Sequence, residues 1–80
     1  MHELGVLLEA VKKVNNIAQQ HNIKNVKHIT LEVGESSGYV PMYFVKLFPV
    51  AIDGFDLMKG AELKIAMAPG GGLQIKDIGY

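Results

Sequence analysis

The first segment of the chain repeats apolar residues at the spacing of a helix. These positions lie three or four residues apart: Leu4, Leu7, Val11, Val14 and Ala18. Such spacing places them along one face of a helix, with polar residues on the other. Glu3 falls in the first turn, where a carboxylate stabilises the positive end of the helix dipole. His21 and Asn22 suit the last turn and the C-cap. The pattern predicts one amphipathic helix over residues 4–21.

Three later segments alternate apolar and polar residues, as strands with one buried face do. They cover residues 26–33, 62–68 and 73–76. The alternation changes phase at Asp77-Ile78, which indicates a β-bulge or a strand end. Pro69 to Gly72 separates the last two segments, and a short glycine-rich connection is typical of an antiparallel hairpin. We therefore expect the last two strands to pair with each other.

A second helix is expected between the first two strands. Pro41 suits its first position, where the missing N–H costs nothing. Pro49 removes a backbone hydrogen bond farther along, so we expect a kink or an early end near Leu47 or Phe48, with a short continuation to Ile52. The Met and Phe residues of this helix are expected in the core. Its broad apolar face consists of Phe44, Val45, Leu47, Phe48, Ala51 and Ile52. Any exposed part of that face would be a partner surface.

The element order predicts an α+β fold in a single domain of residues 1–80. The expected order is helix, strand, helix, strand, strand, giving a three-stranded, largely antiparallel sheet with both helices packed on one face. A three-stranded sheet leaves free edges, so strand pairing between two copies is possible.

Composition excludes several classes of function. The 80 residues contain no cysteine, and eight basic residues balance eight acidic ones. Disulfides, thiol nucleophiles and cysteine-ligated zinc or iron–sulfur centres are therefore excluded. The balanced, scattered charge gives no footprint for nucleic acid or an anionic membrane. No apolar run is long enough to span a bilayer, and the first residues lack the basic n-region of a signal peptide, so we expect a cytoplasmic location.

Most candidate chemical groups have an ordinary structural interpretation. His21 and His28 have no partner at metal-ligand spacing and are expected at a helix end and on a polar strand face. The carboxylate pairs Glu32/Glu35 and Asp53/Asp56 flank turns, and the sequence places neither pair in one pocket. No nucleophile motif or cofactor fingerprint is present, so we do not expect an enzyme.

His2 differs because it follows Met1. With a free amine on Met1, the amine, the His2 amide and the His2 imidazole supply three nitrogens in fused chelate rings. Square-planar or tetragonal nitrogen sets suit Ni(II) and Cu(II). The amide or carboxylate of Glu3, another side chain or a partner would complete the set. A solvated terminus is the alternative, and the spacing by itself favours it.

Several segments resemble one known family, in that family's order and over nearly the whole chain. The start, Met1-His2-Glu3-Leu4, and the segment from Ile29 to Pro41 resemble the HypA-type nickel-incorporation chaperones of hydrogenase and urease. Residues 59–65 and 75–78 are similar to that family's last two strands. The resemblance implies an α/β domain that binds nickel through its N-terminal Met-His-Glu.

Carried over to this chain, Met1, His2 and Glu3 become the candidate site for Ni(II). The resemblance also implies partners, namely a maturation GTPase and the large subunit of [NiFe]-hydrogenase, or urease in some organisms. Family members carry a zinc module with two CxxC pairs between the last two strands, and residues 69–72 stand in its place here. We therefore expect no zinc, whether the loss is natural or engineered. Pro49 and Met42-Tyr43 also depart from the expected second helix.

Two functions remain open on the sequence. The first is a nickel-binding metallochaperone domain. The second is a metal-free interaction module that binds a maturation partner through its helices or a sheet edge, or associates with itself.

Overall fold

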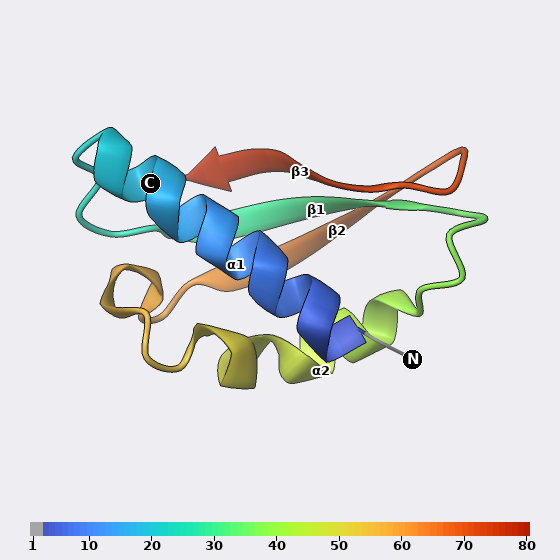
Figure 1. Cartoon of the computed structure of the whole chain (residues 1–80), viewed down its shortest axis with the longest axis horizontal. Helices are drawn as coiled ribbons and strands as arrows, with labels where there is room; N and C mark the ends of the chain where they lie inside the picture. Colours follow the sequence, from blue (N-terminus) through green and yellow to red (C-terminus); the bar gives the residue numbers. More distant parts are fainter. Residues whose placement is uncertain (1–2) are drawn as a thin grey trace.

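The computed structural model describes residues 3–80 of the chain. Two helices cover one face of a three-stranded sheet (Figure 1). The elements follow in the order α1 (Glu3–Gln20), β1 (His28–Gly34), α2 (Pro41–Ile52), the short 3₁₀ helix η1 (Asp56–Met58), β2 (Glu62–Ala68) and β3 (Leu73–Gly79). The α+β class, the order of the elements and the placement of both helices are confirmed.

Helix α1 ends in a Schellman motif, as its sequence indicates. Asn22 adopts a left-handed conformation with φ of 57°. The N–H of Ile23 bonds to the carbonyl of Ala18 over 2.8 Å, and that of Asn22 bonds to the carbonyl of Gln19 over 3.3 Å. These two bonds satisfy carbonyls that the helix would otherwise leave unpaired. The chain is thereby turned back toward β1.

Strand β1 is the centre of the sheet, and the expected hairpin of the last two strands is wrong. The strand order is β2-β1-β3, with β2 parallel and β3 antiparallel to β1. Ile29, Leu31 and Val33 of β1 are each at most 2% exposed, whereas the apolar residues of β2 and β3 stay half-buried or exposed. The alternating apolar residues of β1 are buried most completely because the strand is covered by a neighbour on each side.

The glycine-rich connection therefore crosses the end of β1 instead of closing a hairpin. Gly34, the last residue of β1, donates its N–H to Gly72 over 2.7 Å, and Ser36 donates to Gly70 over 2.9 Å. A Cβ on Gly34 would overlap the Gly70 carbonyl and lie 2.7 Å from the Gly72 nitrogen. The crossing fits only because Gly34 has no side chain.

The phase change near the end of the chain is a β-bulge, as predicted. Leu31 lies opposite Ile75, but Thr30 lies opposite Asp77, so Lys76 is the extra residue in β3. The bulge returns Ile78 to the apolar face, opposite Ile29.

Helix α2 runs from Pro41 to Ile52, as expected for a helix that continues past Pro49, and the alternative of an early end is excluded. Pro49 leaves the carbonyl of Val45 without its helical partner. Both residues are exposed, so water can hydrogen-bond that carbonyl. Met42, which was expected in the core, is 58% exposed, and Val45 of the apolar face is 47% exposed.

The core lies between the helices and the sheet. Phe44 and Phe48 of α2 are buried there with the inner faces of α1 and β1. The sequence did not reveal η1, whose Met58 is fully buried. The carbonyl of Leu57 in η1 accepts the N–H of Val26 over 2.7 Å, which fixes the approach to β1. No helix in residues 3–80 is long and apolar enough to cross a membrane.

Candidate metal centre

The candidate site begins at the start of α1. Met1 and His2, two of the three expected nickel ligands, lie outside the described residues. Glu3 is the first residue of α1, and it is only 4% exposed. Its Oε2 accepts a hydrogen bond from the backbone N–H of Val40 over 3.2 Å. The third proposed ligand is thus held against the start of α2.

Glu3 is buried because it lies on the inner stripe of α1. It precedes Leu7 by four residues, and the buried positions of the helix are Glu3, Leu7, Val11, Val14 and Ala18. Leu4, which the apolar pattern placed on that stripe, is 38% exposed. The spacing already indicated that position 3 faces inward, because residues four apart share a helix face. An acidic residue on the buried face of a helix indicates a hydrogen-bond donor in the element that packs against it.

That partner is a backbone group at the N-terminus of α2. Val40 is the N-cap residue and has no side chain that could cap the helix. Tyr39 packs its ring against Phe44 at a centroid distance of 5.6 Å, which holds the loop in place. The part-buried N–H of Val40 then takes an acceptor from another element, since the first N–H groups of a helix have no intrahelical partner. Glu3 supplies it from α1.

The environment of Glu3 favours its charged form. Hydrogen bonds to the carboxylate, with the one from Val40 among them, lower the pKa of Glu3 below its ordinary value, although burial acts to raise it. The first turn of α1 adds the positive end of the helix dipole. A negative charge therefore lies next to His2 in the sequence at neutral pH.

The other titratable residues do not form a second centre. Within residues 3–80, no group of three or more His, Asp or Glu side chains is arranged to hold a metal ion. His28 lies on the polar face of β1, as expected, with Nε2 3.4 Å from Oδ2 of Asp77 on β3. His21 is exposed just after α1. These positions match the structural interpretation that the sequence favoured.

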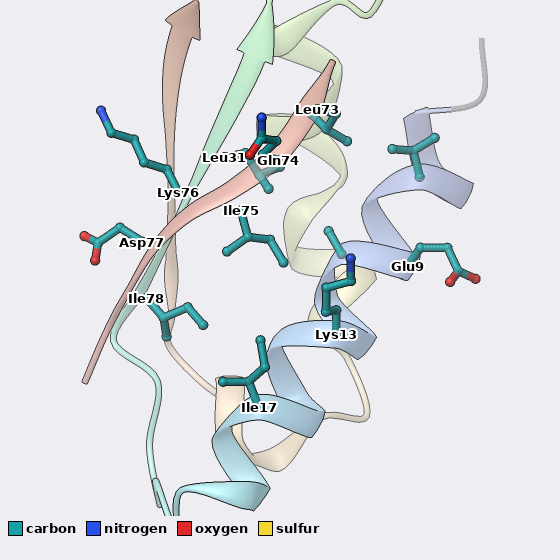
Figure 2. A pocket seen from close by; sticks show the side chains of 12 residues that line it. Glu9, Lys13, Ile17, Leu31, Leu73, Gln74, Ile75, Lys76, Asp77 and Ile78 are labelled. Atoms are coloured by element: carbon teal, nitrogen blue, oxygen red, sulfur yellow. The ribbon is translucent and has the colours of Figure 1, made fainter.

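An open groove of about 710 Å³ runs between α1 and β3 (Figure 2). Ile17, Ile75 and Ile78 point into it, whereas Lys76 and Asp77 project away from α1. No histidine lines the groove, and neither Glu32 nor Glu35 does. The groove offers an apolar floor, and its charged lining residues are Glu9, Lys13, Lys76 and Asp77.

Comparison with known proteins identifies the family of this chain. Residues 1–73 match the family described as "Hydrogenase/urease nickel incorporation, metallochaperone, hypA". The class is therefore that of metallochaperones, which are not catalytic enzymes. The chain belongs to the HypA family.

Individual relatives agree with this assignment. The chain is 35% identical over 69 residues to a hydrogenase maturation factor HypA of Methanosarcina barkeri and 38% identical over 70 residues to one of Trichodesmium erythraeum. The matches cover 86% and 88% of this chain but 51% and 58% of the relatives. The chain thus spans little more than half the length of these curated relatives.

Proposed function

We propose that this protein is a nickel-binding metallochaperone domain that helps to deliver Ni(II) for the maturation of [NiFe]-hydrogenase or urease. Membership of the HypA family is the observation that carries the proposal. The proposed ligands are Met1, His2 and Glu3. Nickel is the cargo here, so the site must release the ion as well as bind it.

The chemistry of these three residues suits Ni(II). The Met1 amine, the His2 amide and the His2 imidazole form adjoining chelate rings, and nitrogen sets of this kind favour Ni(II) or Cu(II) in square-planar or tetragonal geometry. Glu3 contributes its amide or carboxylate. That carboxylate also accepts the N–H of Val40, and a carboxylate has about four lone-pair positions in all.

The anchoring of Glu3 supports a site on an ordered base. Glu3 begins α1 and is hydrogen-bonded to the start of α2. A ligand set built on residues 1–3 is therefore attached to the fold at Glu3. Preorganised neighbours of this kind orient metal ligands and raise their affinity.

The test is a nickel titration on protein with a native, free Met1. The two matched variants are His2→Ala and a chain extended by a few residues ahead of Met1, which converts the amine to an amide. Isothermal calorimetry and the d–d absorption of nickel are expected to show strong loss of binding in both variants. Equal binding by all three proteins would place the nickel elsewhere.

We also propose that this domain lacks the zinc module of its family. The match covers only 51% and 58% of the first two relatives, and residues 69–72 join β2 to β3 at the place expected for that module. Zinc binding, and any step that depends on it, is therefore not expected of residues 1–80. Elemental analysis of protein grown with zinc and nickel checks this directly.

The second candidate function is a metal-free interaction module for a maturation partner, such as the GTPase or the hydrogenase large subunit. The exposed apolar side chains of α2 favour it: Met42, Tyr43, Val45 and Val50. A pull-down of the purified GTPase without nickel, unchanged by His2→Ala but lost in Val45→Lys, would support this function over nickel delivery.

A further inference from the structure

The two helices leave the inner face of β3 only partly covered. Leu73, Ile75 and Ile78 lie opposite buried residues of β1, but they are themselves only half-buried. No residue of α2 lines the groove beside them, so within residues 3–80 the helical wall of the groove is α1 (Figure 2). The apolar face of a sheet is normally covered by helices in folds of this kind. The groove is therefore lined as a site for one more helix would be.

Helix α1 carries a second stripe of residues on the side that lines the groove. Its members are spaced by four, three and four residues: Val6, Ala10, Lys13 and Ile17. The three apolar members are half-buried. This is the spacing with which one helix packs along another, and the small side chain of Ala10 allows a close approach in the middle. The stripe extends over about 16 Å, or about three helical turns.

The charges on the rim define the chemistry of the occupant. Glu9 and Lys13 are exposed and lie four residues apart on α1, whereas Lys76 and Asp77 project away from that helix. A helix antiparallel to α1, with a Glu followed four residues later by a Lys, places each of its charges beside the opposite one. That order also stabilises the incoming helix by itself. The antiparallel direction brings its negative C-terminal end beside the positive end of α1.

The groove begins close to the proposed nickel site. Val6 is the first lining residue of α1, and it follows Glu3 by three residues, which is less than one helical turn. The C-terminal end of an antiparallel helix in the groove therefore lies beside residues 1–3. A metal-binding side chain at that end is placed next to the ion.

We infer that this groove binds an amphipathic helix of the protein that receives the nickel, antiparallel to α1 and with its C-terminal end beside residues 1–3. The apolar face of that helix lies on the half-buried residues of α1 and β3. Glu9 and Lys13 fix its direction. The docking rests on the groove, and the placement of the nickel acceptor rests on the proposed function.

The first test uses a synthetic peptide of about fifteen residues, with apolar positions at helical spacing and one Glu followed four residues later by Lys. Fluorescence anisotropy measures its binding to the full chain without nickel, and NMR spectra of the labelled chain locate it. We expect shifts in the groove, at Ala10, Ile75 and Ile78, and none at Val45 of α2. A scrambled peptide of the same composition is expected not to bind.

Two neighbouring lysines of α1 supply the matched control. Lys13→Glu reverses a charge that lines the groove and is expected to weaken peptide binding by about two- to fivefold. Lys12→Glu changes the net charge equally, at an exposed position that does not line the groove, and is expected to leave binding unchanged. The double variant Glu9→Lys/Lys13→Glu is expected to prefer a peptide in which Glu and Lys are exchanged.

Ala10→Gln tests the apolar floor, because it places a longer side chain in the middle of the groove. It is expected to weaken peptide binding by about tenfold or more. Circular dichroism shows whether this variant is folded, and the exposed charge variants decide the question if it is not. The inference is overturned if the wild-type chain does not bind the peptide, if the shifts fall on α2, or if Lys12→Glu and Lys13→Glu weaken binding equally. Laurate that shifts the groove resonances when the peptide does not would overturn it in favour of an amphiphile.

Nickel tests the orientation separately from the docking. A peptide with a histidine at its C-terminal end is expected to bind the nickel-loaded chain more tightly than the metal-free chain, by about fivefold or more. A peptide with the histidine at its N-terminal end is expected to gain nothing, and neither peptide should gain in His2→Ala. Equal gains for the two peptides would overturn the antiparallel placement. A chain that docks the peptide but binds no nickel would reject the proposed function and not the groove.

Discussion

The carboxylate of Glu3 and the backbone N–H of Val40 join the first turn of α1 to the start of α2 over 3.2 Å. They lie 37 positions apart in the chain, so the contact exists only in the folded protein. It connects one of the proposed nickel ligands with the helix that carries the exposed apolar side chains.

Removing this acceptor is expected to loosen both helices. Glu3→Ala leaves the N–H of Val40 without its partner and should lower the melting temperature clearly. Glu3→Gln keeps an acceptor oxygen and should lower it less. Thermal unfolding gives the ranking, and the amide shift of Val40 in NMR spectra shows whether its hydrogen bond is lost. Equal melting temperatures for both variants and the wild type would contradict a role in holding the fold.

Gly34→Ala is expected to destabilise the protein by about 1–3 kcal/mol, as overpacking of a close contact does. The added Cβ would overlap the backbone of Gly70, which cannot move aside as a side chain can. Gly71→Ala is the matched control in the same connection, because its Cβ would come no nearer than 3.9 Å to any atom outside its chain neighbours. Urea unfolding of both variants measures the difference.

Gly79→Ala should cost less than Gly34→Ala, although its added Cβ also overlaps a neighbour. That neighbour is the imidazole of His28, which can rotate away from β3. The double variant His28→Ala/Gly79→Ala should then recover most of the loss, since the obstacle has been removed. A double-mutant cycle on unfolding free energies measures this coupling. If the losses of unfolding free energy in the two single variants simply add, the His28 imidazole is not the reason that position 79 requires glycine.

Pro49→Ala is expected to stabilise the protein by about 1–3 kcal/mol, because proline inside a helix is about 3 kcal/mol less favourable than alanine. The helix already continues past this position to Ile52, so alanine can restore the bond to the carbonyl of Val45 without a new backbone path. The free energy of unfolding in urea checks the sign. A loss of stability would mean that the proline ring itself packs usefully in α2.

Nickel affinity is expected to fall as the pH drops below about 6.5, where an unperturbed imidazole takes up a proton. Each proton that nickel must displace lowers the apparent affinity by about tenfold per pH unit, so loss of the amine and amide protons steepens the curve. Titrations across this pH range measure the slope. His2→Ala removes the imidazole contribution, and a slope unchanged by that substitution would exclude His2 as a ligand.

The sequence predicted local features well because they depend on neighbouring residues. The helix stripe from Leu7 to Ala18, the left-handed Asn22 and the phase change before Ile78 all appear where the pattern placed them. The errors concern residues whose surroundings are distant in the chain. Val45 and Met42 fit an apolar helix face, but no element in residues 3–80 covers them. Glu3 was expected in the first turn, but its burial and the hydrogen bond that it accepts from Val40 depend on the start of α2.

Periodicity and composition by themselves determined the α+β class, the faces of the helices and strands and the exclusion of cysteine chemistry. The resemblance to the HypA family made Met1, His2 and Glu3 the candidate ligands. Only the tertiary structure decided which strands are neighbours. Residues 69–72 suit a hairpin equally well, and the alternative was selected because β1 buries its apolar side chains best between β2 and β3. Alternation specifies which face of a strand is buried, whereas the partner of its edge depends on the packing of the whole chain.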